Sequence, residues 1–297
     1  MAEKFLILGA NSFYGSNFAK YVEERGDVAI RLSRPEWDMR DGVDVDTHTP
    51  DYIVNFVSQS LVAESWDDPA KWVSVNTGLT AEFLRTAVKY PRTYKKFIHV
   101  STPESYGHTE GWVDETYAAW KPSTPYGVSR AAGDMMLMAY HRAFGFPAII
   151  TRTANIYGPG QGKNRIIPLA FDTLERGEKL LLHGNGYTMR AFIHIKDACA
   201  GLYLAATKGS VGQTYHISTR TEISIANLVK RVAKILGVHT PNFVGTQPDR
   251  VGKDLFYGLL SARIRHMGWS DKISLDKGLQ DYAASRVAVQ PAEPSGG

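Results

Sequence analysis

Cysteine is almost absent from this sequence. The 297 residues include a single one, Cys199, so no disulfide can form within the chain. Such scarcity is typical of proteins from reducing compartments, and we expect a cytoplasmic protein. Cys199 falls inside the apolar helical pattern KDACAGLYLA, where a small buried side chain is the ordinary explanation. The sequence therefore offers no good candidate for a catalytic thiol.

Long hydrophobic runs and dense charge of one sign are also lacking. The N-terminal stretch MAEKFLILGANSF has only a short apolar run, which is typical neither of a signal peptide nor of a membrane span. The formal net charge is +4, and no basic patch reaches the density expected of a nucleic-acid-binding surface. The nine histidines are scattered, without the H-x-x-E-H-type or paired-cysteine spacing of a metal site. We expect no nucleic-acid, membrane or metal partner.

Short apolar runs alternate with helical patterns through the first half of the chain. Most runs are continuously apolar, as expected for strands that are covered on both faces of a parallel sheet. They are KFLILG (4–9), DVAIRLS (27–33), DYIVNFV (51–57), KKFIHVS (95–101) and PAIITRT (147–153). Helical patterns occupy 15–25, 69–89, 125–143, 165–176, 196–207 and 224–236. This order predicts an α/β fold built on a Rossmann-like, doubly wound parallel sheet.

A glycine-rich turn follows the first predicted strand. In LGANSFYGSNF, Gly9 and Gly15 lie six residues apart with Ser12 between them. Glycines let the backbone approach a pyrophosphate, and the N-terminus of the following helix supplies N–H donors. A turn of this kind is a weak signal alone, but it is stronger when it opens the first strand–helix unit of such a sheet. The pattern predicts a dinucleotide site.

The end of the second strand indicates which dinucleotide binds. An acidic residue there favours NAD, whereas a basic residue favours the additional phosphate of NADP. Ser33 and Arg34 stand where the acid is expected, which favours NADP, although Arg34 is also explained as a solvated loop residue. Asp38 and Met39 follow and are placed to contact the adenine.

Two further stretches carry candidate catalytic side chains. Thr102 and Glu104 follow the fourth strand, and residues just beyond the carboxyl ends of parallel strands face the ligand crevice. They are candidates for a hydroxyl donor and an acid/base, with a strand-end threonine and a surface glutamate as the ordinary alternative. In STPYGVSRAAGD, Tyr126 and Arg130 lie on one face of a helix capped by Thr124. For an arbitrary Tyr-x-x-x-Arg, a surface pair is the ordinary explanation.

Together these segments resemble the extended short-chain dehydrogenase/reductase family, specifically its NAD(P)-dependent nucleotide-sugar epimerases and dehydratases. The resemblance spans residues 4–283 and is carried by LGANSFYGSNF, VNFVSQSLVAESWDDP, VNTGLTAEFL, HVSTPESYG, PSTPYGVSRAAGD, RTANIYGPGQ, GYTMRAFIHIKDAC and PDRVGKDLFYGLLSARIRHMGW. The final segment is most similar to sugar-nucleotide 4,6-dehydratases, as is the Thr-x-Glu-x-Tyr-Gly order of TPESYG.

The resemblance implies roles for individual residues. Tyr126 would exchange a proton with the sugar 4-hydroxyl, Thr102 would bond the same oxygen, and Glu104 would remove the C5 proton. Arg130 would hold the nicotinamide ribose and, as a neighbouring cation, lower the pKa of the Tyr126 phenol. The substrate contacts would be Ser60, Asn155, Arg190 and Arg250. The cofactor contacts would be Gly9, Asn11, Ser12, Phe13, Tyr14, Gly15, Arg34, Asp38, Met39, Phe56, Val57, Ser58, Tyr126 and Arg130.

The resemblance also implies an architecture. Residues 1–160 would form the NAD(P)-binding domain and 161–286 a smaller α/β domain for the sugar nucleotide, with some crossing of the chain between them. Residues 287–297, rich in proline and glycine, would be a disordered tail. A homodimer is implied, paired through the helices near 69–89 and 125–143. The cofactor, NADP or NAD, would stay tightly bound.

Three residues depart from the family pattern. Ser12 replaces the middle glycine of the turn, and Pro103 stands where dTDP-glucose dehydratases have an acid. Arg130 replaces the family lysine, and its bulkier fork makes the exchange non-conservative.

Several functions therefore stay open. The first is 4,6-dehydration of a nucleoside-diphosphate sugar. The alternatives are a C4 epimerase, a decarboxylase, an NADPH-dependent 4-keto reductase and a non-catalytic protein that binds the dinucleotide or sugar nucleotide.

Overall fold

A six-stranded parallel sheet forms the centre of the larger lobe. The computed structural model describes residues 1–88, 93–239 and 244–287. The strands of the large sheet are β1 (Lys4–Leu8), β2 (Val28–Leu32), β3 (Tyr52–Asn55), β4 (Lys96–Ser101), β6 (Ala148–Thr153) and β10 (Thr214–Ile217). Their order is β10-β6-β4-β3-β1-β2, and every neighbouring pair is parallel. The predicted doubly wound α/β fold is confirmed.

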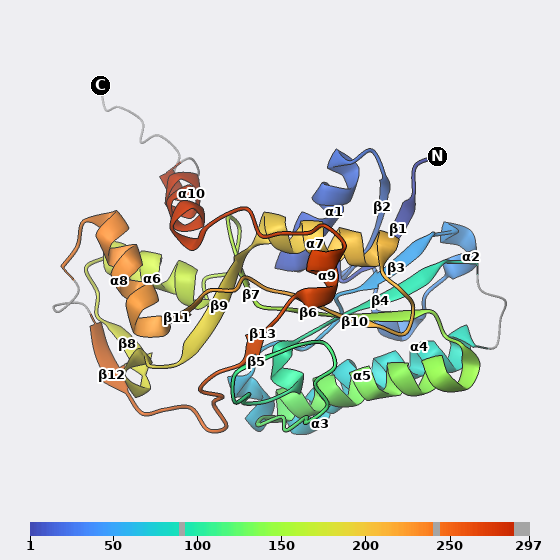
Figure 1. Ribbon diagram of the computed structural model, residues 1–297, viewed down its shortest axis with the longest axis horizontal. Coiled ribbons are helices and arrows are strands. Elements are labelled where there is room, and N and C mark those ends of the chain that lie inside the picture. The colour runs from blue at the N-terminus through green and yellow to red at the C-terminus, as the bar shows by residue number, and fades with distance from the viewer. Residues whose placement is uncertain (89–92, 240–243, 288–297) are drawn as a thin grey trace.

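Helices cover both faces of this sheet (Figure 1). On one face lie α1 (Phe13–Glu24) and α7 (Ile195–Lys208), and on the other α3 (Pro69–Val73), α4 (Leu79–Ala87) and α5 (Pro125–Phe144). Because both faces are covered, β3 and β6 are buried along their whole length. The single helix predicted at 69–89 is wrong in detail: a π-helical turn, η3 (Ser74–Gly78), separates α3 from α4, and residue 89 lies outside the described residues.

The helix that carries the tyrosine and arginine begins as predicted. The Thr124 hydroxyl accepts a hydrogen bond from the Gly127 amide at 3.0 Å, and Pro125 occupies the first turn. The helix ends at Gly145, whose φ of +60° suits a residue without a side chain. This long helix places Tyr126 and Arg130 near the carboxyl ends of the strands.

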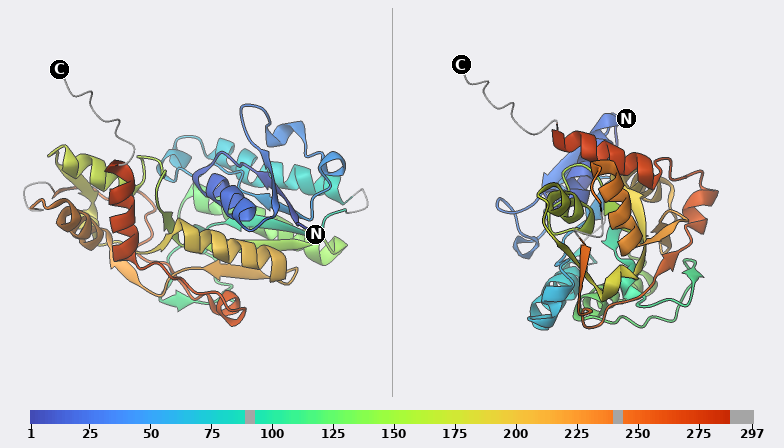
Figure 2. Two further views of the ribbon diagram at one scale, coloured as in Figure 1. Left: turned by 90° about the horizontal axis from the view of Figure 1, so that it is seen from above. Right: turned by 90° about the vertical axis from the view of Figure 1, so that its left-hand side faces the viewer.

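Later segments build a smaller lobe beside the sheet (Figure 2). It contains α6 (Ile166–Glu175), α8 (Ile225–Leu236), α10 (Leu275–Val287), a sheet of β7 (Asn155–Tyr157), β9 (Met189–His194) and β11 (Glu222–Ser224), and the pair β8 (Leu180–His183) with β12 (Val244–Gln247). Its core gathers Phe171, Leu228 and Val232. Since β10 and α7 belong to the larger lobe, the chain crosses between the lobes.

The remaining elements are short. They are α2 (Val45–His48), α9 (Ala262–His266), the pair β5 (Trp112–Val113) and β13 (Gly258–Leu259), and the 3-10 helices η1 (Met39–Asp41), η2 (Ala63–Trp66), η4 (Pro103–Ser105) and η5 (Gly184–Gly186). The predicted tail, 287–297, lies outside the described residues except for Val287 at the end of α10.

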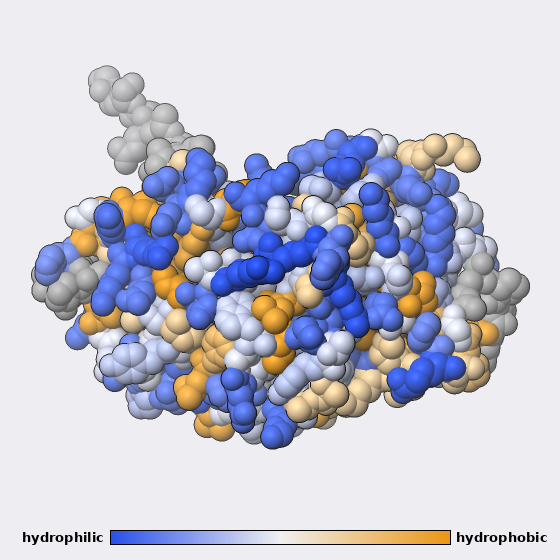
Figure 3. All heavy atoms as spheres, viewed as in Figure 1, coloured by the Kyte–Doolittle hydropathy of each residue, from blue (hydrophilic) through white to orange (hydrophobic). Residues whose placement is uncertain are grey.

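Hydrophilic side chains cover most of the face in Figure 3, with small separate hydrophobic groups among them. Within the described ranges, no helix is both long and apolar enough to cross a bilayer. Those ranges likewise hold no group of three or more His, Cys, Asp or Glu side chains that could bind a metal ion. Cys199 is buried, and burial raises the pKa of its thiol, so it has the inert character expected of a core residue.

Candidate active site

One large cavity lies at the carboxyl edge of the sheet and extends into the smaller lobe. Its volume is about 1240 Å³, enough for a dinucleotide and a second ligand. All the predicted catalytic and substrate residues line it: Thr102, Glu104, Tyr126, Arg130, Ser60, Asn155, Arg190 and Arg250. Among the predicted cofactor residues, Asn11, Ser12, Phe13, Tyr14, Phe56 and Ser58 also line it. The sheet edge thus brings together residues that are far apart in the sequence.

Six predicted cofactor residues do not line the cavity: Gly9, Gly15, Arg34, Asp38, Met39 and Val57. The two glycines instead shape the turn. Gly9 has a φ of +79°, and a Cβ on Gly15 would lie 2.6 Å from the Gly9 carbonyl oxygen. Ser12 fits this turn, because its hydroxyl donates to the Gly9 carbonyl at 2.8 Å and accepts from the Gly15 amide at 3.1 Å. The serine therefore caps α1 where the family pattern has glycine.

The end of β2 lies against this turn. The Asn11 amide donates to the Ser33 hydroxyl at 3.3 Å, and the Asn11 side chain donates to the Arg34 carbonyl at 2.9 Å. The Arg34 side chain is 72% exposed, and its Nε lies 3.9 Å from an oxygen of Asp38. Asp38 also accepts from Arg40, and that hydrogen bond keeps the pKa of the carboxyl well below its usual range. Met39 is buried in the hydrophobic core, so its role is to pack the segment that follows β2.

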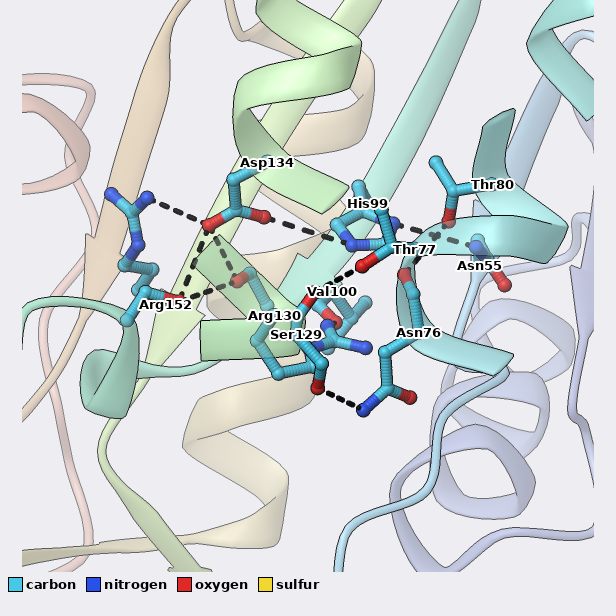
Figure 4. Close-up of polar contacts among 12 residues, drawn as sticks. Asn55, Asn76, Thr77, Thr80, His99, Val100, Ser129, Arg130, Asp134 and Arg152 are labelled. Carbon is cyan, nitrogen blue, oxygen red and sulfur yellow. Dashed lines mark hydrogen bonds and ion pairs between the residues drawn. The ribbon is translucent and has the colours of Figure 1, made fainter. Parts of the chain in front are cut away.

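Tyr126 and Arg130 lie together at the cavity, and both are buried. The Arg130 Nη2 donates to the Val100 carbonyl oxygen of β4 (Figure 4). The charge of Arg130 lowers the pKa of Tyr126, as expected for a neighbouring cation. Burial raises it by more, however, so the net pKa of the phenol lies above 10. The expected effect of the neighbouring cation is therefore present, but desolvation outweighs it and the pKa of the phenol is raised overall.

Thr102 and Glu104 belong to a short turn just past β4. Thr102 caps η4, with its hydroxyl accepting from the Glu104 amide at 3.3 Å, and Pro103 fits the first position of this helix. Burial raises the pKa of Glu104 to about 7, although Arg190 lowers it in part. A carboxyl with a pKa near neutrality can both take up and release a proton at working pH. This is the property that an acid/base residue needs.

The substrate residues lie on the smaller-lobe side of the cavity. Arg190 donates to the main-chain carbonyls of Met189 and Asp254, both at 2.8 Å, and lies over the Tyr257 ring at 4.2 Å. Its hydrogen bonds are to neutral oxygens, so its charge is available for an anion. The Asn155 amide donates to the Ala191 carbonyl at 3.2 Å, and its oxygen faces the Tyr257 hydroxyl at 3.5 Å. Arg250 lies exposed on the same side.

Arg165 and Tyr257 are two of several cavity residues that were not predicted from the sequence. Arg165, at the start of α6, donates to the Ser60 hydroxyl across the cavity at 3.3 Å, and its charge lowers the pKa of both Tyr126 and Glu104. Tyr257 lies under Arg190. Arg165 stands in the polar loop GQGKNR, where one more basic residue gives no signal. Tyr257 falls within the C-terminal segment that carried the resemblance, which was the one available indication.

The cavity also fits a dinucleotide on its own geometry. Within the described part of the chain, Arg130 Nε and Nη1 are buried and have no hydrogen-bond partner. Buried donors of this kind require acceptors, and the hydroxyls of a ribose would supply them. The turn also presents Asn11, Ser12 and Phe13 to the cavity, where the N-terminus of α1 could receive a pyrophosphate. The site residues present are therefore compatible with NAD or NADP.

Comparison with known proteins agrees with this fold. A dTDP-glucose 4,6-dehydratase from Streptomyces niveus is 33% identical over 248 residues, covering 81% of this chain and 72% of that protein. The low-salt glycan biosynthesis protein Agl12 from Haloferax volcanii is 28% identical over 301 residues, covering 93% and 96% of the two chains.

Solved structures are similar over nearly the whole chain. The dTDP-glucose 4,6-dehydratase DesIV from Streptomyces venezuelae, determined with NAD bound, superposes with a TM-score of 0.85 at 28% identity, covering 96% of this chain and 97% of that one. A UDP-glucuronic acid 4-epimerase from Bacillus cereus reaches 0.86 at 22% identity, covering 97% of this chain and all of that one, which shows a shared fold. The model of the NAD dependent epimerase/dehydratase family matches residues 5–218, and the chain belongs to this family of extended short-chain dehydrogenases/reductases.

Proposed function

We propose that the protein catalyses the NAD(P)-dependent 4,6-dehydration of a nucleoside-diphosphate hexose. The observation that carries the proposal is the placement of Glu104, with a pKa of about 7, in the same cavity as Tyr126 and Thr102. Dehydration requires removal of the C5 proton, which a plain oxidation or reduction at C4 does not. The similarity to dTDP-glucose 4,6-dehydratases supports the same reaction class.

Tyr126 and Thr102 act on the sugar 4-oxygen. Thr102 orients the hydroxyl, and Tyr126 takes its proton as C4 becomes a ketone. Arg130 and Arg165 favour the ionised form of Tyr126, since both charges lower the pKa of the phenol. A bound nicotinamide would supply the hydride acceptor and donor for the cycle.

Glu104 acts next to the new ketone. The C4 carbonyl makes the C5 proton acidic, and Glu104 removes it. The C6 hydroxyl then leaves as water with the proton that Glu104 carries, which creates a C5–C6 double bond. Arg130 and the cofactor turn would hold the nicotinamide, which would supply the hydride for C6. With a solvent proton added at C5 and the O4 proton released by Tyr126, the product is the 4-keto-6-deoxy sugar and the net change is the loss of one water. Because this redox cycle is internal, the cofactor stays bound.

The diphosphate is held by the basic side of the cavity. Arg190 and Arg250 provide two positive charges, which match the two negative charges of a diphosphate. Asn155 and Ser60 provide neutral hydrogen-bonding groups beside them. The segment 161–286 thus contributes both arginines of this diphosphate site, while residues 1–160 contribute the cofactor turn, Ser60 and Asn155.

Incubation of the purified protein with a panel of nucleoside-diphosphate hexoses and hexuronic acids tests this proposal. We expect a product lighter by one water, without added cofactor and with bound nicotinamide in the purified protein. An isomer of unchanged mass would indicate a C4 epimerase instead, and loss of carbon dioxide from a hexuronic acid would indicate a decarboxylase. Stoichiometric consumption of added NADPH would indicate a 4-keto reductase.

A binding protein without turnover is the second candidate, and Arg130 is the observation that favours it. Arginine replaces the family lysine, and the pKa of the Tyr126 phenol is raised overall. This candidate predicts that nicotinamide and sugar nucleotides raise the melting temperature while no substrate in the panel changes.

We also propose that two copies of the chain pair through α3 and α5. These helices lie side by side and expose apolar side chains: Val73 is 46% exposed, Val128 48% and Met135 53%. Val128 and Met135 are seven residues apart, so they lie on one face of α5. A second copy would bury this face.

A further inference from the structure

The segment Ser101–Gly107 divides its side chains between the cavity and the core. Thr102 and Glu104 line the cavity, whereas Ser105 and Tyr106 are fully buried behind them. A rigid placement of Thr102 and Glu104 therefore depends on what holds this segment from the core side.

Asp134 is the residue that holds it. Asp134 belongs to α5, one helical turn after Arg130, and is fully buried. Its Oδ2 accepts from the Ser101 hydroxyl at 2.7 Å and from the Ser105 hydroxyl at 3.5 Å. One carboxylate oxygen thus contacts the residues that flank Thr102 and Glu104.

The same carboxylate is held in place by Arg152 of β6 (Figure 4). Arg152 Nη2 donates to Asp134 Oδ2 at 2.7 Å, and Nη1 donates to the Tyr106 hydroxyl at 2.6 Å. The guanidinium also lies 4.3 Å from the centre of the Tyr106 ring and 4.5 Å from that of Trp120. An ion pair and hydrogen bonds of this kind offset the cost of burying a carboxylate.

Two neutral histidines complete the surroundings of Asp134 and Arg152. The Tyr106 hydroxyl donates to His216 Nε2 at 2.8 Å, because His216 Nδ1 lies 3.1 Å from the Leu260 carbonyl and must carry its proton there. His99 Nε2 lies 3.7 Å from Asp134 Oδ1. Burial lowers the pKa of each histidine to about 3, so Arg152 is the cation that balances Asp134.

A second contact joins α5 to the segment Ser101–Gly107. A Cβ on Gly127 would lie 2.7 Å from the Glu104 carbonyl oxygen, so α5 packs directly on the backbone of Glu104. Gly127 and Asp134 are seven residues apart, which is about two helical turns on one face. Contacts at two separated points fix the orientation of the segment as well as its distance from the helix.

We propose that Asp134 is a positioning residue of the active site. From the helix that carries Tyr126 and Arg130, it fixes the segment that carries Thr102 and Glu104, so the four groups keep one mutual geometry. This inference rests on the proposed function for its kinetic consequence. A displacement of about 1 Å at a reacting group costs roughly 10²-fold in rate, whereas substrate binding by Arg190 and Arg250 is unaffected by this contact.

The test compares Asp134→Asn with Asp172→Asn. Asp172 is a matched control, because it is also a buried helical aspartate, ion-paired with Arg286 at 2.6 Å, and does not line the cavity. We expect Asp134→Asn to lower kcat by roughly 10²-fold with KM for the sugar nucleotide within about twofold and bound nicotinamide retained. Asp172→Asn should keep kcat. Equal kcat values in the two variants would overturn the proposal.

Ser101 provides a second pair of variants if Asp134→Asn does not fold. Ser101→Ala removes one hydrogen bond to Asp134 and should lower kcat by about tenfold, with KM unchanged. Ser101→Thr keeps the hydroxyl and should restore most of the rate. A rate loss in the threonine variant equal to that in the alanine variant would contradict a role for this hydrogen bond.

Amide hydrogen exchange tests the geometry without turnover. The Tyr106 amide donates to the Pro103 carbonyl at 2.9 Å and the Gly107 amide to the Glu104 carbonyl at 3.2 Å. In Asp134→Asn these amides should exchange at least about tenfold faster than in wild type, and in Asp172→Asn they should not. Unchanged exchange in Asp134→Asn refutes the positioning role. A wild-type protein that converts no sugar nucleotide refutes the proposed function alone.

Discussion

The Arg130 guanidinium is fixed to the main-chain carbonyl oxygen of Val100, one helical turn from Tyr126. The arginine therefore approaches the phenol from a fixed point on β4, and its Nε and Nη1 remain available for a ligand. A lysine in the same place would be a point charge on a flexible stem. Either cation would favour ionisation of the phenol. Only the arginine has separate nitrogens, so that Nη2 can bond the Val100 carbonyl while Nε and Nη1 stay available for a ligand.

Replacement of Arg130 separates charge from shape. Arg130→Lys keeps the charge and should retain kcat within about tenfold. Arg130→Met removes the charge that lowers the pKa of Tyr126, so it should lower kcat by 10²-fold or more, roughly the contribution of one acid/base residue. Single-turnover absorbance of the reduced nicotinamide measures the step directly. If wild type is inactive and Arg130→Lys gains turnover, the binding-protein candidate is favoured.

Stability should depend on pH through Glu104, whether or not the protein is a catalyst. The folded pKa of about 7 lies above the ordinary value of 4.5, so folding is opposed by ionisation. The penalty is absent below the unfolded value, grows between the two values and is constant above about 7. Glu104→Gln should therefore gain roughly 1–3 kcal/mol over wild type at about pH 8 and little at about pH 4. Thermal unfolding at both pH values measures it, and an equal gain at both would exclude the raised pKa.

The rate should depend on pH with the matching sign. Glu104 must be ionised to remove the C5 proton, so kcat/KM should rise with pH and level off above about 7. Glu104→Gln should lower kcat by roughly 10²–10⁴-fold. Deuterium incorporation at C5 from heavy water isolates this step. If Glu104→Gln still exchanges that proton at the wild-type rate, another group is the base.

The fold was predictable where a local pattern determines it. The strands at 4–9 and 147–153 are recognisable by their apolar stretches FLIL and AII, and β1 and β6 are covered on both faces. The strand β10 (Thr214–Ile217) was not predicted, because TYHI mixes polar and apolar residues. His216 is buried there through its bonds to Tyr106 and Leu260, and such partners are not visible in the sequence.

The site was predictable where strand ends or a known motif mark it. Thr102, Glu104, Tyr126 and Arg130 meet in one cavity as the parallel-sheet rule requires. Asp134 was not singled out, since an aspartate within a helix resembles a solvated residue until its contacts are known. The direction of the pKa of Tyr126 also depends on tertiary structure, because the sequence shows the neighbouring arginine but not the burial that outweighs it.

Arg34 predicts a preference for NADP. Its side chain is exposed at the end of β2, next to the cofactor turn, where a 2′-phosphate would meet it. Arg34→Ala should weaken NADP binding by about tenfold and leave NAD binding within about twofold. Arg31→Ala is the control, because Arg31 lies within β2, three residues before Arg34, and is paired with Glu23. Calorimetric titration of each dinucleotide into cofactor-free protein measures both affinities. Tighter binding of NAD than of NADP to wild type would contradict the predicted preference for NADP.

The exposed apolar face of α3 and α5 predicts a dimer. Light scattering should give about twice the chain mass of 32.9 kDa. Met135→Glu places a charge where a second copy would bury it, so the variant should dissociate to a monomer at micromolar concentration. Val211→Glu is the control, because Val211 is 37% exposed outside both helices and should leave the mass unchanged. α5 also carries Tyr126 and Arg130, so loss of the dimer should reduce activity as well as mass. A wild-type monomer with full activity would show that this helix face needs no partner.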